Sequence, residues 1–378
     1  MSPRRYQLRD SELNEAVESL VERTQQIYGE RAGADFVRQM LVTGVRLLRD
    51  GAGEGDLKLI NSALKELRHS LRVFAPYEHH RKVAVFGSAR TAPESGDWKQ
   101  ARAFAERIVE AGWMVITGAG GGIMAAAQGG AGREASFGVN IRLPFEQEAN
   151  PVIANDPKLI NFRYFFTRKV VFVKESHAIA LFPGGYGTHD EGLETLTLIQ
   201  TGKGEILPVV FVDEPGGSYW RDWEQYVHSH LSERGFISEE DLDLFTVTDD
   251  VDVAVKEILN FYSNYHSSRF VGDELVMRVR VAPDSEQLDA LNSEFPDILT
   301  SGAIGVGAAL AGEGDEVVAL PRVCLRFNRR NRGRLRVLID RINDLVKDEA
   351  SPPIEASPHE IFPLQIPDDA RNAEDSEG

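Results

Sequence analysis

Hydrophobic residues recur every three or four positions through the first part of the chain. Three segments show this spacing: residues 11–28, 35–49 and 56–75. Such spacing places apolar side chains on one face of a helix. Ser11 has a residue type that helix N-caps prefer, and the glycine-rich segment 50–56 separates two of the helices. We therefore predict a helical region over residues 1–80 that serves packing or dimerisation.

From Lys82 the pattern changes to short apolar runs that end in or near glycine or proline. The runs are residues 82–88, 113–117, 137–143, 178–183 and 206–213. Amphipathic stretches lie between and after them, among them residues 97–111, 167–178 and 250–265. Alternating buried strands and helices are typical of a parallel sheet covered on both faces. The predicted fold class is therefore α/β, a Rossmann-like domain over residues 81–265.

The last third of the chain follows a different pattern. Apolar and polar residues alternate over residues 274–281, which predicts a half-exposed strand. Helical patterns follow at 284–295 and near 334–346, so we predict a small α+β domain of unknown role over 268–347. Residues 348–378 are rich in proline and acid, a composition typical of disorder.

Composition excludes several classes of function. The chain has 42 Lys and Arg against 59 Asp and Glu, a net charge of −17, which argues against general binding of nucleic acid. No apolar run reaches the length of a membrane span, and the first residues do not resemble a secretory signal. The single cysteine, Cys324, cannot form an internal disulfide. We expect a cytoplasmic protein with neither membrane nor nucleic-acid partners.

Glycine-rich turns follow three of the predicted strands, at Gly87, at 118–122 and at 184–187. In a parallel sheet these turns lie at the carboxyl ends of the strands, where such folds bind ligands. Glycine lets a ligand approach the backbone, and the following helix offers free N–H groups and a positive dipole end. Two such strand-to-helix turns on one sheet predict a phosphate or nucleotide site.

Two familiar nucleotide motifs do not fit. Residues 118–122 come near the dinucleotide fingerprint, but they follow the second predicted strand instead of the first. The next strand ends near Arg142, where that fingerprint needs an acid, so NAD is disfavoured. The chain also lacks a P-loop. We expect neither a cofactor nor a metal.

Charged residues flank the third glycine turn. Asp190 and Glu191 follow it, in the expected first turn of the next helix, and Arg168 and Lys169 lie on the helix before it. A carboxylate can activate water and stabilise positive charge on a sugar carbon, and an arginine can hold a phosphate or orient the acid. This combination suits cleavage at the anomeric carbon of a nucleoside monophosphate, although acids there can also simply complement the helix dipole.

The segment "PGGYGTHDE", residues 183–191, resembles the P-G-G-x-G-T-x-x-E motif of the LOG family. Residues 83–90, 117–127 and 162–173, and residues 206–213 with Tyr219 and Trp220, are similar to companion segments of that family. Its members are nucleoside 5′-monophosphate phosphoribohydrolases, including cytokinin-activating enzymes, and were long labelled lysine decarboxylases. The resemblance implies at least a homodimer. It also implies hydrolysis of AMP or a cytokinin riboside monophosphate to free base and ribose 5-phosphate.

The resemblance also implies residue roles. Arg168 and Glu191 are the implied catalytic pair. The implied substrate and phosphate ligands are Gly87, Ser88, Gly120, Gly121, Gly122, Gly184, Gly185, Gly187 and Thr188. Further candidates are Arg90, Lys169 and Met124. Two positions depart from many relatives, because Ala119 stands for a glycine and Ala125 for a glutamate.

Other functions stay open. Molybdenum-cofactor carrier proteins resemble the same fold and share its glycine motifs, which would make the site a non-catalytic binder. A decarboxylase would need a Schiff-base lysine, such as Lys169 or Lys174. His189 is either a local proton donor or an ordinary helix residue.

The small C-terminal domain carries an arginine cluster: Arg326, Arg329, Arg330, Arg332, Arg334 and Arg336. It could bind a phosphorylated effector. Alternatively, it is a solvated basic loop, or it docks on acidic surface of the same chain.

Overall fold

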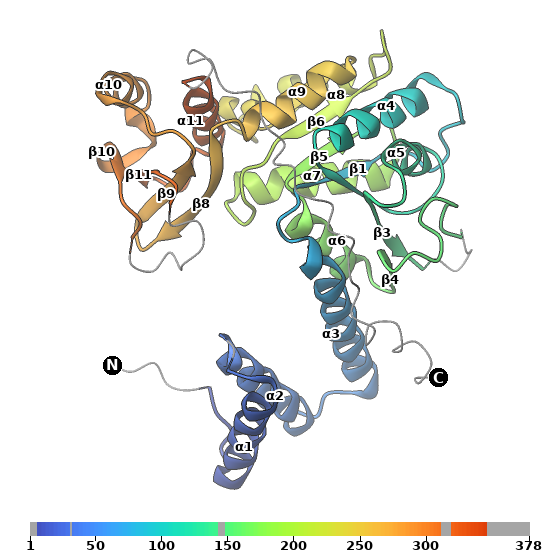
Figure 1. Ribbon diagram of the computed structural model, residues 1–378, viewed down its shortest axis with the longest axis vertical. Helices are drawn as coiled ribbons and strands as arrows, with labels where there is room; N and C mark the ends of the chain where they lie inside the picture. The colour runs from blue at the N-terminus through green and yellow to red at the C-terminus, as the bar shows by residue number, and fades with distance from the viewer. Residues whose placement is uncertain (1–5, 31, 143–147, 311–318, 346–378) are drawn as a thin grey trace. The chain divides into compact units, whose positions relative to one another are not determined.

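The computed structural model describes residues 6–30, 32–142, 148–310 and 319–345 (Figure 1). The described residues up to His69 and those from Ser70 onward form two compact units. The expected division between 81–265 and 268–347 falls inside the second unit, and the expected tail 348–378 lies outside the described residues. Within the described ranges, no helix is both long and apolar enough to cross a membrane.

The first unit consists of helices, as the apolar spacing predicts. They are α1 (Ser11–Tyr28), α2 (Ala34–Arg49) and most of α3 (Glu54–Phe74). The proposed cap at Ser11 is wrong: Asp10 is the N-cap of α1, and its carboxylate accepts a hydrogen bond from the Leu13 N–H at 2.9 Å. α1 and α2 pack together, and Val21 and Val42 are buried.

The second unit contains a seven-stranded parallel sheet, which confirms the predicted α/β class. Its strands are β1 (Lys82–Phe86), β2 (Met114–Thr117), β3 (Ser136–Ile141), β4 (Leu159–Phe162), β5 (Ala178–Leu181), β6 (Val209–Val212) and β7 (Thr246–Thr248). The strand order is β4-β3-β2-β1-β5-β6-β7. The hydrophobic pattern did not predict β4 or β7, because polar residues interrupt the apolar ones in both, Asn161 in β4 and the two threonines in β7.

Helices cover both faces of this sheet (Figure 1). They are α4 (Gly96–Glu110), α5 (Ile123–Ala131), α6 (Phe165–Glu175), α7 (Tyr186–Gln200), α8 (Tyr219–Val227) and α9 (Val251–Phe261). Buried residues of α4, α5 and α9 form one core with Val83, Val85 and Val210 of the strands. On the other face Phe86 packs against Phe172 of α6, with ring centroids 4.8 Å apart.

The chain reverses its direction across the sheet between β1 and β5. From β1 it proceeds outward through β2, β3 and β4, and from β5 it proceeds the other way through β6 and β7. The strands are parallel, so the loops after β1 and β5 diverge at the same edge and leave a crevice. The fold therefore predicts a ligand site between the residues that follow Phe86 and those that follow Leu181.

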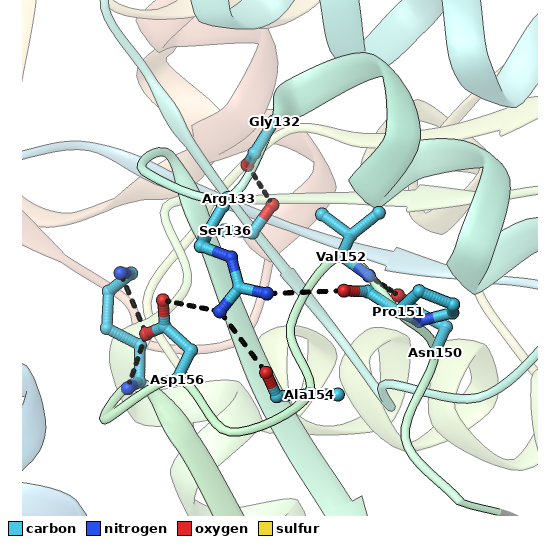
Figure 2. A network of polar contacts seen from close by, with 9 residues as sticks. Gly132, Arg133, Ser136, Asn150, Pro151, Val152, Ala154 and Asp156 are labelled. Carbon is cyan, nitrogen blue, oxygen red and sulfur yellow. Dashed lines mark hydrogen bonds and ion pairs between the residues drawn. The ribbon is translucent and has the colours of Figure 1, made fainter.

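Residues 150–156, which precede β4, are held by polar contacts of Arg133 (Figure 2). Its guanidinium donates hydrogen bonds to the carbonyls of Ala154, at 3.2 Å, and Pro151, at 3.3 Å. The same group lies 3.7 Å from the carboxylate of Asp156. Asn150, at the start of this stretch, is hydrogen-bonded to the loop that follows β2 through the carbonyls of Ala119 and Gly120.

The C-terminal part of the second unit is a small antiparallel sheet with strand order β10-β11-β9-β8. Its elements are β8 (Tyr265–Val271), β9 (Glu274–Val279), α10 (Ser285–Glu294), β10 (Leu299–Gly307), β11 (Arg322–Phe327) and α11 (Arg332–Asp344).

The prediction of a half-exposed strand over residues 274–281 is wrong. β9 pairs with β8 on one side and β11 on the other, and all its residues but Glu274 are buried. The helix expected to reach 265 ends at Phe261, where the chain turns into β8.

Short helical turns complete the unit. They are η1 (Ala75–Tyr77), η2 (His228–Ser232), η3 (Glu239–Leu244) and η4 (Pro296–Ile298). α11 packs against η3, α9 and α7, so the small sheet is joined to the parallel-sheet core through this helix.

Candidate functional site

A cavity of about 740 Å³ lies at the carboxyl ends of β1 and β5, at the point where the strand order reverses. Its lining includes ten residues named from the sequence: Gly87, Ser88, Arg90, Met124, Arg168, Gly184, Gly185, Gly187, Thr188 and Glu191. Gly120, Gly121, Gly122 and Lys169 are not among the residues that line it. Its size is in the range of small-ligand sites.

The loops after β1 and β5 contact each other directly. The Ser88 N–H donates a hydrogen bond to the Pro183 carbonyl at 3.1 Å. A Cβ on Gly184 would lie 2.1 Å from the Thr188 hydroxyl oxygen and 3.0 Å from the Ser88 nitrogen. Only glycine therefore fits at position 184 without moving one of the two loops.

The turn places the N-terminus of α7 at the cavity. Gly185 is the N-cap, and no side chain caps the helix. The Gly185 carbonyl accepts hydrogen bonds from the N–H groups of Thr188 and His189 at 3.0 and 3.2 Å. The earlier N–H groups of the first turn and the positive end of the helix dipole are thus available to an anion.

The acidic pair lies deeper in α7 than the sequence suggested. The helix begins at Tyr186 instead of near Thr188, so Asp190 and Glu191 fall in its second turn. The expectation of a first-turn pair is wrong, and simple pairing with the helix dipole does not explain these acids, because that effect fades beyond the first turn. Asp190 is exposed, whereas Glu191 is only 8% exposed.

Burial changes the acidity of Glu191. Loss of hydration raises its pKa from 4.5 to about 7, although the nearby charges of Arg168 and Lys169 act to lower it. A carboxylate with a pKa near neutrality can take up and release protons at physiological pH. Perturbed acids of this kind in a cavity are typical of functional sites.

Arg168 is held beside the cavity by the neighbouring strand and helix. Its Nε donates a hydrogen bond to the Val139 carbonyl at 2.9 Å, and its guanidinium lies 5.1 Å from the Phe172 ring centroid. A Cβ on Gly118 would lie 2.6 Å from its terminal nitrogen, so that glycine leaves room for the guanidinium. Burial lowers the pKa of Arg168, and the negative charge of Glu191 partly opposes this effect. The guanidinium still stays charged under ordinary conditions.

Lys169 is directed to α7 and not to the cavity. Its ammonium lies 2.8 Å from the carboxylates of both Asp190 and Glu194. Burial alone would lower its pKa, but the hydrogen bonds to these two acids outweigh that effect and raise it. Lys169 therefore links α6 to α7 through two ion pairs.

Tyr219, the first residue of α8, lines the cavity and contacts the glycine turn. Its hydroxyl donates a hydrogen bond to the Gly184 carbonyl, and its oxygen lies 2.7 Å from Nε2 of His189. Because the tyrosine proton is used on Gly184, His189 must be the donor in that contact. Burial lowers the pKa of His189, which favours its neutral form. The pair fixes the peptide plane between Gly184 and Gly185.

The glycines after β2 support the loop at Ser88. A Cβ on Gly122, whose φ is +57°, would lie 2.2 Å from the Ser88 carbonyl oxygen. The Asn150 side chain donates hydrogen bonds to the carbonyls of Ala119 and Gly120 at 3.1 and 3.0 Å. Ala119 itself has a φ of +63°, a conformation that favours the glycine of many relatives. This loop is therefore a rigid support for the cavity wall.

Several cavity residues were not named from the sequence as site residues. They include Gly118, Phe165, Tyr186 and Tyr219. Gly118 stood in a glycine-rich run and Tyr219 in a segment similar to the LOG family, so a signal existed for both. Phe165 and Tyr186 also lie in segments similar to the LOG family, but neither side chain was singled out within its segment.

The arginine cluster of the small domain is engaged within the protein. Arg336 is buried and contacts the carboxylates of Glu257 and Asp340. Arg334 contacts Asp297 at 3.2 Å, and Arg329 donates a hydrogen bond to the Gly272 carbonyl at 3.0 Å. For Arg334 and Arg336 these contacts match the alternative in which the cluster docks on the chain's own acids, whereas Arg326 and Arg330 are exposed.

The chain is similar to known proteins over part of its length. Residues 121–258 match the family model described as "Possible lysine decarboxylase", which is less than half of the chain. The match includes residues 183–191, the segment whose motif resembles the LOG family. No curated protein matches this chain.

Solved structures also resemble this one. The molybdenum cofactor binding protein of Rippkaea orientalis has 18% identity and a TM-score of 0.33 over 47% of this chain and 94% of its own. The molybdenum cofactor carrier protein of Chlamydomonas reinhardtii has 23% identity and a TM-score of 0.34 over 48% and 98%. DNA processing protein A of Helicobacter pylori has 12% identity and a TM-score of 0.30 over 47% and 80%. With TM-scores this low, the likenesses carry no conclusion about what this chain does.

Proposed function

We propose that this protein hydrolyses the N-glycosidic bond of a nucleoside 5′-monophosphate to free base and ribose 5-phosphate. The observation that carries the proposal is Glu191, a buried acid whose pKa is raised to about 7 by burial. It lies in one cavity with Arg168 and with an uncapped helix N-terminus suited to phosphate. AMP is the first substrate to test, and cytokinin riboside monophosphates are the second.

In the proposed reaction the 5′-phosphate binds the turn at 184–188. Glu191 accepts a proton from a water molecule, whose oxygen forms a bond to the anomeric carbon. The bond from that carbon to the base nitrogen breaks, and its electron pair leaves with the base, which takes up a proton. Arg168, close enough to interact electrostatically with Glu191, holds the carboxylate and the reacting sugar in place.

Lysine decarboxylation, the activity in the name of the matching family, fits these residues poorly. A Schiff-base lysine needs a lowered pKa so that its amine can attack a carbonyl. Within the described ranges no lysine lines the main cavity. Lys169 is held by two carboxylates that raise its pKa, and Lys174 lies 2.6 Å from Glu175.

The test is chromatography of the products after incubation with a panel of nucleoside 5′-monophosphates and the matching nucleosides. We expect base release from the monophosphates only. Glu191→Gln and Arg168→Ala should each lower turnover by about 100-fold or more. Glu224→Gln, an exposed glutamate on α8, is the matched control and should keep full activity.

Two other outcomes would decide against the hydrolase. Intact monophosphates that nevertheless bind tightly, with affinity lost in Gly184→Ala, would favour a carrier or sensor. Base release that persists in Glu191→Gln would show that another group supplies the chemistry.

A further inference from the structure

Helix α3 carries an apolar stripe with a regular seven-residue repeat. The stripe consists of Leu57, Ile60, Leu64, Leu67 and Leu71, which follow one another at alternate spacings of three and four residues. This spacing keeps apolar side chains in one narrow line along a helix, and it is the repeat of a coiled coil. The sequence of α3 therefore favours packing against a second helix.

Most of this stripe is exposed. Ile60, Leu64 and Leu71 are 42%, 51% and 47% exposed, and Leu57 and Leu67 are partly buried. Among the described residues of the first unit, α1 packs against α2, whereas α3 has no comparable packing against either helix. A continuous exposed stripe of large apolar side chains is unfavourable in water and is typical of an interaction surface.

An identical helix is the partner that this stripe fits. In a coiled coil each apolar side chain inserts between side chains of the facing helix, so both helices need the same repeat. In α1, Leu13, Leu20 and Ile27 also lie seven residues apart and are exposed, but Ala16 and Arg23 occupy the second position of that repeat. The stripe of α3 has large apolar residues at both positions, and a second copy of the chain presents the same stripe.

The charges along α3 favour an antiparallel pair. Residues 54–63 contain two acids and one lysine, so their net charge is −1. Residues 65–74 contain three Lys and Arg and one acid, so their net charge is +2 with histidine neutral. A parallel pair would bring the two positive halves together. An antiparallel pair brings each positive half beside the negative half of the other copy, which is the favourable arrangement.

We propose that α3 pairs with α3 of a second copy of this chain in an antiparallel coiled coil. In this pair Leu64 packs against Leu67 of the partner subunit, and Ile60 packs against Leu71 of the partner subunit. Each copy uses the same surface, so a two-fold axis relates the copies and the contact closes at two chains. The proposal does not depend on the proposed hydrolysis, because assembly can be measured without a substrate.

Light scattering of the full-length protein after size exclusion tests the surface. Leu64→Glu places a charge in the middle of the stripe, and because burial of unpaired carboxylates is costly it should halve the molar mass of the assembly. Leu59→Glu is the matched control, since Leu59 lies on the same helix and is 40% exposed but lies outside the stripe. It should keep the wild-type mass. Thermal unfolding checks that both variants are folded.

Disulfide cross-linking tests the direction of the pair without a charged substitution. Cys324 is the single cysteine, so Cys324→Ser gives a background without thiols. In that background, chains with Ile60→Cys and chains with Leu71→Cys are co-expressed with different tags and mildly oxidised. The two kinds of chain should cross-link to each other, because facing core positions lie within reach of a disulfide. Chains with Ile60→Cys alone should cross-link far less.

Several results would overturn the proposal. The pairing is wrong if the wild-type protein has the mass of a single chain, or if Leu64→Glu and Leu59→Glu have equal masses. A loss of thermal stability in Leu64→Glu at an unchanged mass would show that the stripe packs within its own chain. If Leu64→Glu does not fold, absence of the cross-link between Ile60→Cys and Leu71→Cys chains decides against the pair. Efficient cross-linking of Ile60→Cys chains to each other would show a parallel pair instead.

Discussion

The main cavity and the arginine cluster of the small domain both stand out in the sequence as charged sites, but they differ in how their charges are compensated. At the cavity, Glu191 is buried strongly enough that its pKa rises to about 7 despite the nearby Arg168. In the small domain, Arg336 is equally buried but contacts two carboxylates, those of Glu257 and Asp340.

Under the proposed function, the difference separates a charge that serves a ligand from charges that serve the fold. A buried ion that is already paired within the protein has a smaller desolvation cost, and its ion pairs help to hold helices together. A buried ion whose compensation is incomplete costs free energy in the empty protein, and that cost can be recovered when a substrate arrives.

Arg336→Met should lower the free energy of unfolding by about 3 to 5 kcal/mol, because it leaves Glu257 and Asp340 without their cation. Denaturation by urea measures this. Arg326→Met, at an exposed position in the same cluster, is the control and should change stability by less than about 0.5 kcal/mol. Base release per folded molecule should stay at the wild-type level; a collapse of activity in a folded Arg336→Met protein would mean that the two regions are not separate.

Glu191→Gln should stabilise the protein at high pH while it removes activity. The folded pKa of about 7 lies above the unfolded value of 4.5, so the folded state binds the extra proton between them. The stability from Glu191 is complete below about pH 4.5 and is lost as the pH rises through about 7, a change of about 3 kcal/mol. Glutamine keeps its hydrogens at every pH, so the variant should gain about that much over the wild type by pH 8.

Urea denaturation of Glu191→Gln and the wild type across this range gives the comparison. Glu224→Gln should follow the wild-type curve, because its carboxylate is exposed. If the free energy of unfolding of Glu191→Gln changes with pH just as that of the wild type does, ionisation of Glu191 costs no stability in the folded protein. The proposed difference between Glu191 and Arg336 would then be wrong.

Gly184→Ala should lower the kcat/KM for AMP by about 100-fold, since its Cβ forces apart the Thr188 hydroxyl and the Ser88 backbone. Gly187→Ala is the matched steric control, because a Cβ there meets no atom within 4 Å. It should leave the free energy of unfolding unchanged within about 0.5 kcal/mol. Equal losses of activity and equal stability in the two variants would show that the close approach at Gly184 is unimportant.

Tyr219→Phe should give the smallest effect, a rise of about fivefold in the KM for AMP with kcat nearly unchanged. It removes the hydrogen bond to the Gly184 carbonyl and the acceptor for His189. Steady-state kinetics separate the two parameters. A fall in kcat with constant KM would instead assign the tyrosine hydroxyl to the chemical step.

The general position of the site followed from the sequence because parallel strands share an edge. Glycine turns after two neighbouring strands must lie near each other, and the structure brings the turns after Phe86 and Leu181 to one cavity. The strand pattern and the alternation with helices rest on short-range rules of burial, which local sequence carries well.

Other features depend on contacts that local sequence does not contain. The direction of Lys169 is set by Asp190 and Glu194, which lie one helical turn apart on a different helix. The burial of Glu191 depends on where α7 begins, and an error of two residues in that boundary moved it from one turn to the next. β9 has the alternating pattern of an exposed strand, yet it is buried because it is central in its sheet.

The two loops after β1 and β5 determine each other's conformation. The Ser88 N–H is hydrogen-bonded to the Pro183 carbonyl, and Gly184 approaches Ser88 closely. A transplant of residues 183–191 into another parallel sheet would carry the motif without the surface that shapes it. Any chimera built from this protein should therefore exchange residues 87–90 and 183–191 as one module, and divergence at either loop restricts which changes the other can accept.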